Sequence, residues 1–102
     1  MAKNNKTNKE LDGFQKVVQE MILLKESKAG DYQNSWQVLG IEGLNYQIAR
    51  KFTRIWINRN KEELNNEVLR DSYMDLAVYS IMAIQLLDSG ETKDKIEKLL
   101  KE

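Results

Sequence analysis

Residues 67–87 constrain the fold most strongly, because they combine a long apolar segment with regularly spaced acidic side chains. Between Leu76 and Leu87 only Ser80 and Gln85 interrupt the apolar residues. A helix that is hydrophobic nearly all round is typical of a protein core. The segment is too short and too acidic to span a bilayer, which needs roughly 20 apolar residues. We therefore expect a buried helix at the centre of a small domain.

The acidic side chains of this helix form a ridge along one face. Glu67, Asp71 and Asp75 recur every four residues, and Tyr79 continues the same row. A carboxylate among apolar neighbours must be paired, because an isolated buried charge is costly. We expect Asp75 to be buried and bonded to a basic or hydroxyl group from the preceding helix or from the loop around Tyr32.

Helical periodicity and glycine stop signals place the other elements. The pattern predicts helices over residues 8–29 and 44–58, with Gly30 ending the first of them. Gly90 ends the central helix, and Thr92 begins a short last helix that carries Ile96, Leu99 and Leu100.

The domain organisation follows from these elements. Residues 1–7 are polar and read as a disordered tail, whereas residues 8–102 form a single helical domain. No strand alternation occurs, and the chain contains no Pro. The predicted fold class is all-α, a small antiparallel bundle of about four helices. Because so short a chain builds only a small core, we expect a homo-oligomer.

The 44–58 helix has an apolar side, a basic stripe and a neighbour of opposite charge. The apolar side, assigned to the core, carries Leu44, Ile48, Ala49, Phe52, Ile55 and Trp56. The second stripe carries Gln47, Arg50, Lys51, Arg54 and Asn58. Short connections make this helix an antiparallel neighbour of the acidic ridge. Two interpretations stay open: a structural layer of salt bridges, or a polar pocket.

The pocket interpretation assigns a role to each kind of side chain. Arg50, Lys51 and Arg54 supply positive charge for phosphates. Tyr32 or Trp36, in the connection between the first two helices, supplies a stacking face for a base. Trp36 has an alternative role, in which its side chain is buried in the core instead of stacking on a base. The acidic residues are available for sugar hydroxyls or for a metal ion.

Composition excludes several classes of chemistry and of partner. The chain has no His and no Cys, which excludes Ser-His and Cys-His nucleophiles, imidazole or thiolate metal sites and disulfides. With 16 basic and 16 acidic residues the net charge is zero, so we expect no duplex nucleic acid partner. The start of the chain lacks an apolar signal region and we expect no membrane partner, so the expected location is the cytoplasm.

Three blocks of sequence resemble the nucleotide modification-associated domain of type 1, a small helical family common in phages and prophages. The blocks are Lys28-Ala-Gly-Asp31-Tyr32-Gln-Asn-Ser-Trp36, then Lys51-Phe-Thr-Arg54-Ile55, then Asp71-Ser-Tyr-Met-Asp75-Leu-Ala-Val-Tyr79. The resemblance covers about residues 20–87. It implies a role around nucleotides. The resemblance and the pocket interpretation together give the expected ligand-binding set, which is Lys28, Asp31, Tyr32, Trp36, Arg50, Lys51, Arg54, Asp75 and Tyr79.

The family is distantly similar to the all-α nucleoside triphosphate pyrophosphatases of the MazG and dimeric dUTPase group, which bind Mg²⁺ through Glu-Glu-x-x-Glu and Glu-x-x-Asp motifs. Asp75 matches the Asp of the second motif, but Ser72 occupies its Glu position, and the first helix has Glu20 and Glu26 without the first motif.

We therefore expect a non-catalytic nucleotide-binding protein that needs no cofactor and sequesters a nucleotide, such as an immune signal. One alternative is a Mg²⁺-dependent pyrophosphatase with Glu67, Asp71 and Asp75 as metal ligands. A second alternative is a structural or adaptor bundle.

Overall fold

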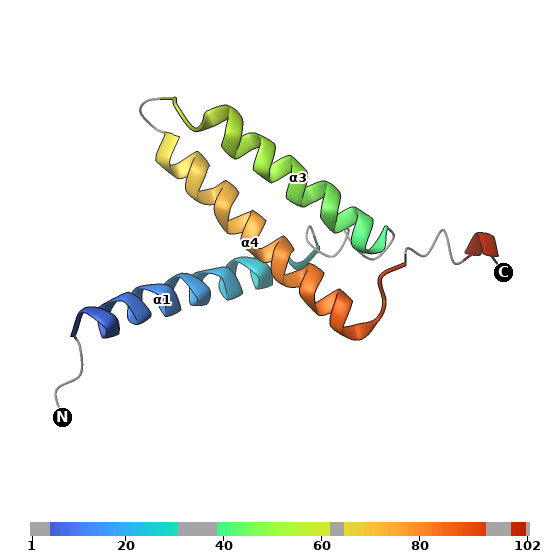
Figure 1. Ribbon diagram of the computed structural model, residues 1–102, viewed down its shortest axis with the longest axis horizontal. Coiled ribbons are helices and arrows are strands. Elements are labelled where there is room, and N and C mark those ends of the chain that lie inside the picture. Colours follow the sequence, from blue (N-terminus) through green and yellow to red (C-terminus); the bar gives the residue numbers. More distant parts are fainter. Residues whose placement is uncertain (1–4, 31–38, 62–64, 94–98, 102) are drawn as a thin grey trace.

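The computed structural model describes residues 5–30, 39–61, 65–93 and 99–101. These residues form three long helices, α1 (Asn5–Ser27), α3 (Gly40–Asn58) and α4 (Asn65–Ser89). The all-α fold predicted from the sequence is confirmed. Helices α3 and α4 lie side by side as an antiparallel hairpin, and α1 crosses α4 at an angle (Figure 1).

The helix boundaries differ from the predicted ones in three places. Helix α1 begins at Asn5 and ends at Ser27, and residues 29–30 are again helical, so Gly30 does not act as the expected stop. Helix α3 begins at Gly40, four residues before the predicted start. Gly90 does end α4, with a φ of 76° and its N–H donating to the carbonyl oxygen of Leu87 at 3.2 Å.

Helix α3 starts early because its first turn is held by other parts of the chain. Gly40 adopts a φ of 60°, and Gly40 and Gly43 are both buried. The N–H of Ile41 donates to the carbonyl oxygen of Thr92 at 3.1 Å, which joins the start of α3 to the segment after α4. These tertiary contacts offset the low helix propensity of glycine, about 1 kcal/mol per residue.

The core lies between α3 and α4 and is small. Its buried members are Leu44, Val78, Tyr79, Met82 and Leu86, with Met21, Leu24, Ile41, Ile48 and Ala83 packed partly against them. Leu44 from α3 is fully buried against the α4 side chains. Helix α1 reaches this core only through its C-terminal half, and its N-terminal half projects away from the hairpin (Figure 1).

Two expectations about the core are wrong for the chain on its own. The central helix was expected to be buried all round, but Ile81, Ile84 and Leu87 of α4 are exposed. Phe52 and Trp56 were assigned to the core, but each remains 56% exposed on α3. In the described part of the chain one helix, α1, crosses the hairpin and covers one of its two faces, so no described layer packs against these side chains.

The remaining sequence expectations concern the ends of the chain. The apolar stripe of the short last helix is represented by Leu99 and Leu100, which are exposed, whereas Ile96 lies outside the described residues. Among the described helices, none has the length and apolar character required to cross a bilayer.

Candidate functional site

The basic stripe of α3 meets the acidic ridge of α4 through one ion pair. Lys51 Nζ lies 2.9 Å from Asp75 Oδ2, and the two side chains are only 12% and 16% exposed. The predicted pairing of Asp75 with a basic residue of the preceding helix is therefore confirmed. The pair forms because antiparallel packing of the apolar faces of α3 and α4 brings their adjacent polar stripes together.

A second ion pair joins α4 to α1. Arg70 Nη2 lies 2.6 Å from Glu20 Oε2, and both side chains are well exposed. Sequence reasoning missed this pair. Glu20 and Leu24 lie four residues apart on one face of α1, and Lys28 follows four residues later, directly after the helix, with its N–H donating to the carbonyl oxygen of Leu24 at 3.0 Å. That spacing gave no indication of which helix the face contacts.

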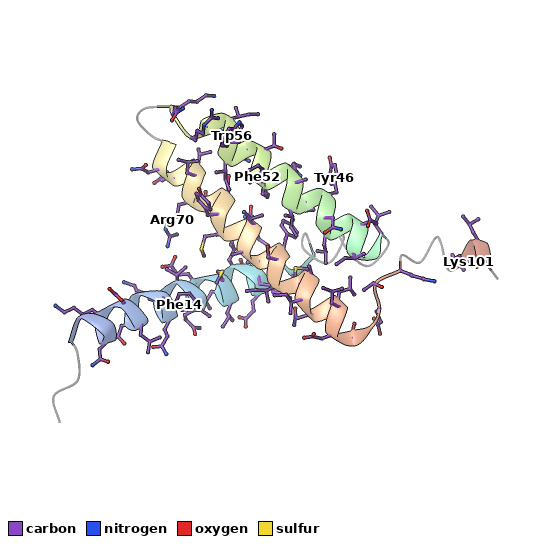
Figure 2. All side chains as sticks on the ribbon, viewed as in Figure 1. Phe14, Tyr46, Phe52, Trp56, Arg70 and Lys101 are labelled. Atoms are coloured by element: carbon purple, nitrogen blue, oxygen red, sulfur yellow. The ribbon has the colours of Figure 1, made fainter. Side chains whose placement is uncertain are left out.

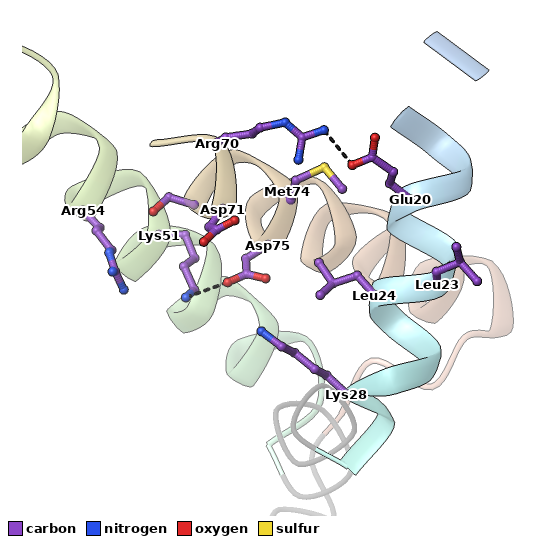
Figure 3. A pocket seen from close by; sticks show the side chains of 11 residues that line it. Glu20, Leu23, Leu24, Lys28, Lys51, Arg54, Arg70, Asp71, Met74 and Asp75 are labelled. Atoms are coloured by element: carbon purple, nitrogen blue, oxygen red, sulfur yellow. Dashed lines mark hydrogen bonds and ion pairs between the residues drawn. The ribbon is translucent and has the colours of Figure 1, made fainter. Parts of the chain in front are cut away.

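The three helices enclose an open pocket between these two ion pairs, with a volume of about 510 Å³ (Figure 3). Its size falls in the range of small-molecule sites, roughly 300–1,000 Å³. The lining residues are Glu20, Leu23, Leu24 and Lys28 of α1 and its end, Lys51 and Arg54 of α3, and Arg70, Asp71, Ser72, Met74 and Asp75 of α4.

The charges of the pocket are only partly neutralised within it. Four cationic and three acidic side chains line it, and two ion pairs engage Lys51 and Arg70. Within the described part of the chain, neither Lys28 nor Arg54 forms an ion pair. Lys28 extends from the end of α1 toward the Lys51–Asp75 pair (Figure 3). The two pocket cations without an ion pair therefore come from different parts of the chain, Lys28 from the end of α1 and Arg54 from α3.

The pocket brings together five of the residues predicted from the sequence, Lys28, Lys51, Arg54, Asp71 and Asp75. Arg50 does not line it. Its guanidinium is exposed and donates from Nη1 to Gln47 Oε1 at 3.3 Å. Tyr79 is a core residue rather than a pocket residue. The predicted ligands Asp31, Tyr32 and Trp36 lie outside the described residues.

The three metal ligands of the enzyme alternative are not assembled into a metal site here. Glu67 does not line the pocket, and Lys51 occupies one oxygen of Asp75. Across residues 5–30, 39–61, 65–93 and 99–101, no group of three acidic side chains is arranged to hold a metal ion. Ser72 is buried, and its hydroxyl donates to the carbonyl oxygen of Val68 at 2.8 Å.

The fold and the pocket define a small all-α protein with a charged pocket between its helices. The family described as nucleotide modification associated domain 1 matches residues 28–87, more than half of the 102-residue chain. The chain therefore belongs to this family. No curated protein and no solved structure matches the chain.

Proposed function

We propose that the chain is a non-catalytic nucleotide-binding protein whose pocket holds a phosphate group between Lys28 and Arg54. The observation that carries the proposal is the pocket of about 510 Å³ in which these two cations have no ion pair in the described part of the chain. Membership of a family associated with nucleotide modification supports a nucleotide as the source of the phosphate.

The two cations suit a phosphate in complementary ways. The planar guanidinium of Arg54 can donate two parallel hydrogen bonds to phosphate oxygens, and the ammonium of Lys28 acts as a compact charge. Leu23, Leu24 and Met74 give the same pocket an apolar wall for the sugar or base. Stacking of the base on Tyr32 or Trp36 stays a prediction from the sequence.

The proposal changes the role first assigned to the basic stripe of α3. Lys51 is already held by Asp75, so its main function is to neutralise that carboxylate beside the ligand. Arg50 does not line the pocket, so we assign its place in the phosphate site to Lys28, which directly follows α1.

The absence of catalysis is supported by the chemistry of the lining residues. Phosphoanhydride hydrolysis by an all-α pyrophosphatase needs Mg²⁺ held by several carboxylates. The pocket offers Asp71, Glu20 and the paired Asp75, without a metal-binding group among the described residues, and the chain has no His or Cys.

A small protein that binds without turnover removes its ligand from solution. We extend the proposal to sequestration of a nucleotide signal by a phage-type protein.

The test has two parts, both on the purified full chain. Denaturing extraction followed by mass spectrometry is expected to release an intact nucleotide. Calorimetric titration with linear and cyclic nucleotides is expected to give the same affinity in EDTA and in Mg²⁺, with no pyrophosphate released. Pyrophosphate release that depends on Mg²⁺ would establish the pyrophosphatase alternative. No binding by any nucleotide in either buffer would favour the structural bundle.

A further inference from the structure

The hairpin of α3 and α4 has an apolar face that no other described helix covers. We call it the back face and define it by Phe52 and Trp56 of α3 and Tyr73, Ile84 and Leu87 of α4. Each of these side chains is more than half exposed. At the edge of the back face the guanidinium of Arg59 lies 3.7 Å from the centroid of the Trp56 ring. Phe52 and Trp56 stack on each other with ring centroids 6.3 Å apart and lie one turn apart on α3 (Figure 2). Exposed apolar side chains gathered in this way mark an interaction surface.

Helical geometry places the back face opposite the pocket. With 3.6 residues per turn, Tyr73, Ile84 and Leu87 lie about 180° around α4 from the row of Asp71, Asp75 and Val78. On α3, Phe52 and Trp56 lie about 150° from Lys51 and Arg54. The pocket and α1 therefore cover one face of the hairpin.

The chain is more extended and exposes more surface than a compact domain of the same length and mass. The radius of gyration is 17.1 Å, whereas a compact domain of this length has about 13 Å. The exposed surface is 8037 Å², compared with about 6,000 Å² for a compact monomer of 11.9 kDa. The excess of about 2,000 Å² belongs to the whole chain, including the projecting half of α1, and it is more than the roughly 800 Å² that each partner contributes to a standard interface.

We propose that the back face packs against the back face of a second copy of this chain, so that two hairpins form a four-helix bundle. A two-helix layer needs a second layer, and a second identical hairpin supplies one of matching length and apolar character. A two-fold axis then uses the same residues from both copies. Zero net charge means that no overall repulsion opposes association. Both pockets stay open, since they lie on the outer faces of the dimer.

The dimer also accounts for the sequence pattern of α4. Its core row, which includes Tyr79, Met82 and Leu86, packs within the chain. A second row with heptad-like spacing consists of Leu69, Tyr73, Leu76, Ser80, Ala83 and Leu87. Tyr73 and Leu87 of this row are exposed on the back face, whereas Ala83 already packs partly against the core. A helix that is apolar on both sides is buried on both sides only when a second hairpin covers the back face.

Two isoleucines provide a matched test by sedimentation velocity from about 1 to 100 μM. Ile84 on the back face is 58% exposed, and Ile57 on the outer side of α3 is 60% exposed. We expect the unmodified chain and Ile57→Glu to sediment as dimers, and Ile84→Glu to sediment as a monomer with helical circular dichroism. If Ile84→Glu does not fold, Ile84→Ala is used instead, and it should raise the dimer dissociation constant about tenfold or more relative to Ile57→Ala.

Three outcomes would overturn the inference. The unmodified chain could remain monomeric at 100 μM. The Ile84 and Ile57 variants could dissociate to the same extent. Phe14→Glu, on the projecting half of α1, could abolish a dimer that Ile84→Glu leaves intact, which would move the interface to α1.

Discussion

Replacing Asp75 by Ala is expected to lower the melting temperature by more than about 10 °C. The substitution strands the ammonium of Lys51, whose side chain is 12% exposed between α3 and α4. Removing one member of a buried ion pair costs about 3–5 kcal/mol. We expect the lower end of that range because both side chains keep some exposure to water. In a chain of this size each kcal/mol changes the melting temperature by about 4–8 °C.

The measurement is thermal unfolding followed by circular dichroism, with all variants at one protein concentration because association shifts the apparent stability. Arg70→Ala is the matched control, since it breaks the exposed pair with Glu20 and should cost less than about 1 kcal/mol. The double variant Lys51→Met with Asp75→Leu should recover most of the loss. A melting temperature within about 2 °C of the unmodified chain for Asp75→Ala would show that the pair contributes nothing to stability.

Replacing Arg54 by Ala is expected to weaken nucleotide binding by about tenfold to a hundredfold. Charge-assisted hydrogen bonds contribute about 1.5–3 kcal/mol each, and each 1.4 kcal/mol is a factor of ten in affinity. Arg54 lines the pocket and has no ion pair within the described residues, so its loss removes an available phosphate contact. The readout is the dissociation constant by calorimetry in EDTA.

Arg50 supplies the matched control for this comparison. It is an arginine on the same helix, one turn before Arg54, but it bonds to Gln47 outside the pocket. Arg50→Ala should change the affinity by less than about twofold, apart from weak long-range attraction that salt screens. Equal losses for the two variants would mean that general charge on α3, rather than this pocket, attracts the ligand.

The sequence predicted the fold and a polar partner for Asp75 because both depend on local periodicity. Apolar residues with a 3.6-residue period placed α3 and α4, and their adjacent stripes made the basic residues of α3 candidate partners of Asp75. Only the packing identifies Lys51 as that partner. The same periodicity assigned Arg50 to the phosphate site, but Arg50 does not line the pocket. A stripe spans a wide arc of the helix, and only the packing shows which edge of it faces the pocket.

Helical periodicity did not identify Glu20 as a pocket residue, and Lys28 was assigned to the site only through the family resemblance. Glu20 and Lys28 face the pocket because α1 crosses α4 at an angle, and that crossing depends on tertiary packing rather than on spacing in the sequence. Tyr79 was placed in the acidic ridge by its spacing in the sequence, but its side chain lies in the core. The next turn of α4 enters the core, so the side chain packs among Leu44, Val78 and Met82.

The most direct test of the phosphate site is to map the contact by NMR. Backbone amide signals of the isotope-labelled chain would be followed during titration, in EDTA, with a nucleotide that binds in the calorimetric experiment. We expect the largest chemical-shift changes in residues 23–28, 51–54 and 70–75, which surround the pocket from three helices. Changes concentrated on the back face around Trp56 and Tyr73, with the pocket signals unmoved, would contradict phosphate binding between Lys28 and Arg54.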